Sequence, residues 1–93
     1  MLVNGSIKVE LKYGETARVV IETLQQDWIS LYRQNVALTR AMDERALREY
    51  EIHDMHNNNH LIDGIEEVLR YYMPIDEFEI WVKMAEDDCR SMR

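Results

Sequence analysis

The segment DMHNNNHLIDG, residues 54–64, places three asparagines between two histidines in a region where the apolar residues have helical spacing. The residues that carry this spacing are Met55, Asn58, Ile62, Ile65, Leu69 and Tyr72. Intervals of three and four residues put all of them on one stripe of a helix. The stripe predicts a helix over residues 47–73 with one inward-facing amide, Asn58.

A second stripe with the same intervals lies earlier in the chain. It consists of Ile21, Leu24, Trp28, Leu31, Asn35, Leu38 and Met42. This stripe predicts a helix over residues 21–43, and it also contains one asparagine. A single fold-back point near residues 46–47 would place Asn35 opposite Asn58 and Trp28 opposite Ile65. We therefore expect an antiparallel helical hairpin in which Asn35 and Asn58 form a structural polar layer.

The alternative is one unbroken helix from residue 21 to residue 73. Between the stripes there is no glycine or proline, and Asp43 is the one local signal for a helix boundary. Such a helix would need a partner to bury its apolar stripe.

The ends of the chain predict two further elements. In SIKVELKY, residues 6–13, apolar and polar side chains alternate, and Asn4-Gly5 is a hairpin turn signal. We expect a β-ribbon over residues 1–20. Pro74 ends the second helix, and Asp76 can begin a third over residues 76–90. The expected fold class is mainly α, in one domain over residues 1–93.

Composition limits the stability and the location of this domain. A chain of 93 residues supports a thin core, so we expect a homo-oligomer. Cys89 is the lone cysteine, which excludes a disulfide within the chain and fits a reducing cytoplasm. The start of the chain has no basic region followed by an apolar run, and no apolar stretch approaches 18 residues. A cytoplasmic location is the expectation.

Negative charge is concentrated in the last third of the chain. The net charge is −7, and residues 63–93 carry nine acidic against four basic residues. Nucleic-acid phosphates prefer the opposite sign, so we expect no direct nucleic-acid binding. A basic, nucleic-acid-binding host protein is a candidate partner. The acidic residues that we predict to contact it are Glu77, Glu79, Glu86 and Asp87.

The three histidines all lie within eight residues, on the side of the helix opposite Asn58 and Ile62. His56 and His60, four residues apart, are weak candidates for a metal site. The glutamate of a zinc-binding His-Glu-x-x-His helix is absent. No set of residues completes a catalytic site, so we expect neither an enzyme nor a bound cofactor. A solvated face, or an interface that responds near pH 6, is the simpler interpretation of the histidines.

The segment DMHNNNHLIDGIEEVLRYYM resembles one that recurs in small uncharacterised proteins of tailed bacteriophages. The matching positions are Asp54, Asn58, Leu61, Ile62, Asp63, Gly64, Tyr71 and Tyr72. VVIETLQQDWISLY is similar to their first helix, so the resemblance covers residues 19–73. Gly64 stands where those proteins usually have alanine, and a proline before Asp54 is absent. The resemblance implies a viral helical hairpin without a defined activity.

Together these features predict a small acidic protein-interaction module, a phage-encoded accessory protein or inhibitor that binds a host protein. If the protein is viral, its location is the cytoplasm of the bacterial host. The alternatives are a small-ligand or metal-binding module that uses the histidines or an inter-subunit pocket, and a virion assembly component. No membrane partner is expected.

Overall fold

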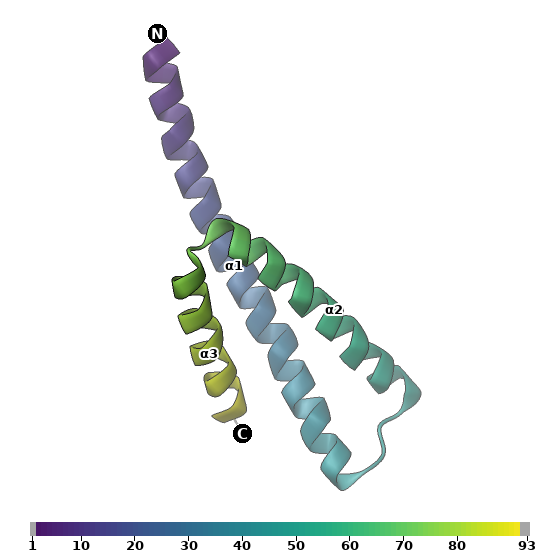
Figure 1. The fold of residues 1–93 in the computed structure, drawn as a ribbon. Coiled ribbons are helices and arrows are strands. Elements are labelled where there is room, and N and C mark those ends of the chain that lie inside the picture. The colour runs from purple at the N-terminus through teal and green to yellow at the C-terminus, as the bar shows by residue number, and fades with distance from the viewer. Residues whose placement is uncertain (1, 92–93) are drawn as a thin grey trace.

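The computed structural model describes the backbone of residues 2–91 and the side chains of residues 17–91. It contains three helices, α1 (Leu2–Glu44), α2 (Glu49–Tyr72) and α3 (Ile75–Ser91), and no strand within these residues. Figure 1 shows that α2 folds back along α1, and that α3 turns again and runs beside α1. The mainly helical fold class is thus confirmed. The observed helix ends lie within two residues of the expected ends, except for the start of α1.

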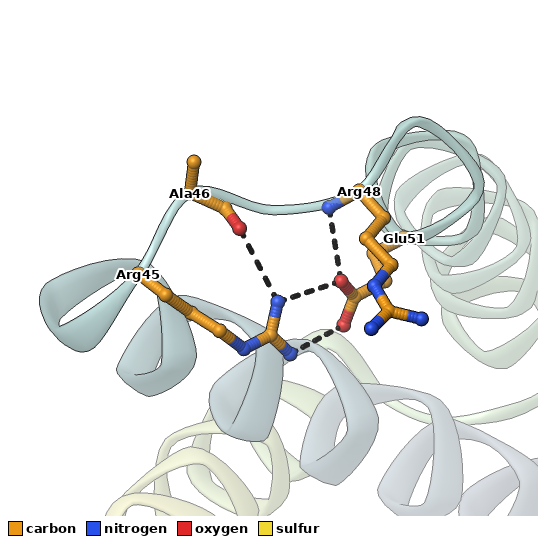
Figure 2. A network of polar contacts seen from close by, with 4 residues as sticks. All are labelled: Arg45, Ala46, Arg48 and Glu51. Carbon is orange, nitrogen blue, oxygen red and sulfur yellow. Dashed lines mark hydrogen bonds and ion pairs between the residues drawn. The ribbon is translucent and has the colours of Figure 1, made fainter.

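The chain reverses direction between α1 and α2, so the single unbroken helix is excluded. Because this turn has neither glycine nor proline, side chains stabilise it instead (Figure 2). The guanidinium of Arg45 donates two hydrogen bonds to the Glu51 carboxylate, at 2.8 and 2.9 Å. The same carboxylate accepts the backbone N–H of Arg48 at 2.9 Å, which caps the start of α2. These bonds lower the pKa of Glu51 to about 2.

The β-ribbon predicted over residues 1–20 is wrong for the part that the structure describes, because α1 begins at Leu2. Residue 1 lies outside the described residues. A ribbon of two short strands is marginal without a surface to pack on. Once residues 21–44 are helical, extending the helix toward the N-terminus gains one hydrogen bond for each residue fixed. Figure 1 shows the first part of α1 extending beyond α2 and α3.

The core lies where the three helices meet. Its buried apolar residues are Trp28, Ile62, Leu69, Phe78, Ala85 and Cys89. Trp28 is fully buried, with its ring stacked on Tyr32 at 4.7 Å and edge-on to Trp81 at 5.2 Å. Its indole N–H donates to Glu66 at 3.0 Å, so its one polar atom has a partner on α2. Truncating such a residue to alanine typically costs about 3–5 kcal/mol.

The chain is much less compact than a typical globular protein of the same mass. A compact monomer of 11.2 kDa would expose roughly 5,700 Å², whereas this chain exposes 7408 Å². Its radius of gyration is 17.6 Å, against roughly 12 Å for a compact chain of this length. Within residues 17–91, ten large apolar side chains are at least 41% exposed, compared with six apolar residues that are buried. Much of the apolar surface is therefore uncovered within one chain.

Candidate interaction surfaces

The predicted polar layer is present at the α1–α2 seam. The amide nitrogen of Asn58, which is 6% exposed, donates to the side-chain oxygens of Asn35 and Gln34 at 3.1 Å each. The Asn35 amide donates in turn to the Asn59 side-chain oxygen at 2.8 Å. Within the described side chains, no buried polar atom lacks a partner. This satisfied network sets the register of the hairpin and leaves no group directed at a ligand.

The histidines point away from the core. His53, His56 and His60 are all exposed, and the His53 imidazole lies 3.9 Å from the Glu49 carboxylate. Among the residues that the structure describes, no three metal-binding side chains lie close enough to hold an ion. The arrangement of His56 and His60 therefore offers two ligands on an open surface.

The four acidic residues predicted to contact a partner are not brought together in one patch. Glu79 and Glu86 are seven residues apart and share one flank of α3. The Glu86 carboxylate lies 3.4 Å from a guanidinium nitrogen of Arg90, which offsets part of its charge. Glu77 is about 200° around the helix from Glu79, because each residue advances by about 100°. Only Glu77 and Asp87 flank the side of α3 that faces solvent.

That solvent-facing side, here called the outer face of α3, has an apolar centre that charge counting missed. Ile80 and Met84, four residues apart, are each 62% exposed. The acidic residues Asp76 and Glu77 precede this pair by one helical turn, and Asp87 and Asp88 follow it by one turn. The four-residue spacing of Ile80 and Met84 in the sequence was the signal that could have revealed this face.

Beside the outer face lies a groove of about 410 Å³ between α1 and α3, the α1–α3 groove. It is lined by Ile29, Arg33, Trp81, Met84, Ala85, Asp88, Cys89 and Ser91. Burial raises the pKa of the Cys89 thiol, so this side chain remains neutral and packs as an apolar group. Met84 belongs both to this groove and to the outer face, which makes the two surfaces continuous.

A second groove, of about 420 Å³, lies between α1 and α2 beside the C-terminal end of α3 and is here called the α1–α2 groove. It is lined by Tyr32, Asn35, Val36, Thr39, Arg40, Met55, Asn59 and Arg90. Arg40 donates to the backbone oxygen of Arg90 at 2.6 Å. A hydrogen bond with Tyr32 raises the pKa of Arg90. Both guanidinium groups thus already bond to protein groups that line this groove.

Comparisons with known proteins assign no family to this arrangement. No family model, curated protein or solved structure matches the chain. No described helix is long and apolar enough to cross a membrane.

Proposed function

We propose that the chain is a small protein-interaction module that binds a partner protein through the outer face of α3 and the adjoining α1–α3 groove. The partner would present an apolar patch flanked by basic side chains. A basic host protein fits this chemistry, and a phage-encoded accessory protein or inhibitor fits a module of this size.

The observation that supports the proposal is the order of side chains along the outer face of α3. Two exposed apolar residues, Ile80 and Met84, lie between two pairs of carboxylates, Asp76 with Glu77 and Asp87 with Asp88. Protein interfaces commonly have this arrangement, with an apolar centre and a polar rim. The half-buried Trp81 lines the adjoining groove, and aromatic residues are frequent at the energetic centre of interfaces.

The two kinds of side chain would have different effects on binding. Fully burying Ile80 and Met84 would contribute about 1.5–3 kcal/mol each before the costs of association. The carboxylates would act mainly on the association rate and on the choice of partner, because they remain near solvent. Binding should therefore weaken as salt is added, without being lost completely.

Affinity capture from a bacterial lysate tests the proposal when three forms of the protein are compared. The wild-type protein should retain a partner at low salt, and Ile80→Asp with Met84→Asp should lose that partner. Leu61→Asp with Val68→Asp, on α2, is the matched control and should retain it. Retention by the α3 variant would contradict the proposal. So would binding that is unchanged by charge reversal at Glu77 and Asp87.

The alternative function, binding of a small anionic ligand, is favoured by one observation. The α1–α2 groove contains the side chains of Arg40, Arg90 and Asn59 within a volume typical of ligand pockets. Calorimetry with common nucleotides, and with zinc or nickel for the histidines, tests it. A micromolar isotherm abolished by Arg90→Ala would support a nucleotide site, and one abolished by His56→Ala would support a metal site.

A further inference from the structure

The α1–α2 hairpin has an apolar face that no part of the described chain covers. Helix α3 packs on the side of α1 that carries Ile29, and Arg70 of α2 lies over the ring of Phe78 at 5.2 Å. On the opposite side of the α1–α2 seam lies what we call the open face. It consists of Leu31 and Leu38 from α1 and Leu61, Ile65 and Val68 from α2.

The open face lies beside the packed seam between α1 and α2, on the side toward solvent. Ile65 and Leu31 pack against the core cluster and remain half-buried, so each has a free side. Beyond them, Leu61 is 47% exposed and Val68 is 41% exposed. Leu61, Ile65, Val68 and Tyr72 follow one another at intervals of four, three and four residues. This is the spacing by which one helix packs on another.

The positions that border the open face are almost free of charge, although charged residues make up 31% of the chain. Helical geometry places Ser30, Gln34, Ala37, Ala41, Asn57 and Gly64 along its edges. Along these edges the charged residues are Asp27 and Asp54, one toward each end of the hairpin. Depletion of charge is the compositional feature that distinguishes the centre of an interface from other surface.

Gly64 adds a separate observation. A Cβ atom at this position would meet nothing within 4 Å, so packing within the chain does not require a glycine. A glycine inside a helix costs roughly 1 kcal/mol relative to alanine. Close approach of a helix from another molecule is a physical reason for this residue.

We propose that a second copy of this chain covers the open face, so that two hairpins form a four-helix core with both α3 helices outside. An uncharged apolar face is self-complementary, as an interface about a two-fold axis requires. The acidic surfaces of two copies would instead repel each other, and this arrangement keeps the acidic α3 helices on the periphery. Hairpins that pair in this way have the packing of a four-helix bundle.

The exposed area is sufficient for such a dimer. The chain exposes 7408 Å², about 1,700 Å² more than a compact monomer of its mass. A stable interface requires about 800 Å² from each partner. The exposed Leu61 and Val68 of the open face contribute to this excess. The outer face of α3 remains free, so dimerisation does not depend on the function proposed for α3.

Chain mass in solution, measured by light scattering over a series of concentrations, tests the dimer. The wild-type protein should have twice the 11.2 kDa mass of one chain. Leu61→Glu with Val68→Glu should weaken the dimer by roughly 100-fold or more, because each charge would lose its water without gaining a partner. The matched control is Ile80→Glu with Met84→Glu, which alters equally exposed residues on α3 and should leave the dimer intact.

Circular dichroism shows whether each variant remains helical. If the glutamate variant unfolds, Leu61→Ser with Val68→Ser replaces it, with the same expected loss of the dimer. A wild-type monomer at every concentration would overturn the proposal. A dimer that the α2 variant retains, a dimer that the α3 variant loses, or an assembly larger than two chains would also overturn it.

Discussion

The two faces of the α1–α2 hairpin are built from the same two helices but differ in what lies against them. On one face, α3 covers Trp28 and Ile62 and completes the core. On the other, Leu61 and Val68 remain more than 40% exposed. The comparison shows that an apolar stripe at helical spacing does not identify the surface that will cover it. One stripe is buried by the chain itself, and we propose that the other is buried by a second copy.

The neighbouring residues Leu69 and Val68 should show the largest contrast between the faces. Leu69 is fully buried, so Leu69→Ala should lower the free energy of unfolding by about 2–5 kcal/mol. Val68 is 41% exposed, so Val68→Ala should lower it by less than about 1 kcal/mol in the monomer. Urea denaturation at low protein concentration measures both. Equal losses would mean that the two faces are equally well covered within one chain.

Removing the polar layer between the two faces should cause the next largest loss in the free energy of unfolding. Asn58→Ala removes the donor to Asn35 and Gln34, so we expect a loss of about 1–3 kcal/mol. Asn35→Ala combined with Asn58→Ala should lose less than the sum of the single variants, because each single change leaves its partner unsatisfied. A strictly additive double-mutant cycle in urea would show that the two amides do not interact.

Gly64→Ala should raise the free energy of unfolding, whereas the preceding substitutions lower it. With open space around the new Cβ atom, alanine should stabilise the isolated chain by about 1 kcal/mol. Thermal unfolding followed by circular dichroism at low concentration measures this gain. Destabilisation of the monomer would indicate a close contact within the chain at this position. A larger residue, as in Gly64→Leu, should impair the dimer but not the monomer.

The smallest expected effect on the free energy of unfolding comes from the turn between α1 and α2, and this effect depends on pH. The pKa of Glu51 in the folded chain, about 2, is below its ordinary value of 4.5. The folded state therefore binds fewer protons between these values, so the stabilisation is fully present above pH 4.5 and is lost as pH falls toward 2. Glu51→Gln should flatten the fall in stability over this range. An unchanged acid profile of the variant in urea titrations would contradict a role for this carboxylate.

Local spacing was enough to predict much of this architecture. The two heptad-like stripes led to the hairpin, and the matching positions of Asn35 and Asn58 led to the polar layer. Pro74 marked the break between α2 and α3, because the residue before a proline disfavours helical geometry. Each of these signals comes either from residues that are neighbours in the sequence or from two apolar stripes whose repeats match.

Features that depend on competition between distant segments were not predicted. The alternation of Ile7, Val9 and Leu11 suits a strand, but residues 2–91 contain no sheet that could support one, and α1 continues through this segment. The turn is stabilised by Arg45 reaching Glu51, a contact that leaves no glycine or proline signal. Counting charges did not show how the acidic residues are distributed around α3, where Glu77 and Glu79 lie about 200° apart. The exposed pair Ile80 and Met84 was missed because only acidic residues of this helix were predicted to contact a partner.

The most direct test of this account is the accessibility of individual methyl groups to a soluble paramagnetic reagent, measured by NMR on the wild-type protein. We expect the methyl signals of Leu61 and Val68 to be protected, because a second copy covers them, and those of Ile80 and Met84 to be strongly broadened. Equal broadening of all four residues would contradict the account, because the two faces would then be equally open to solvent.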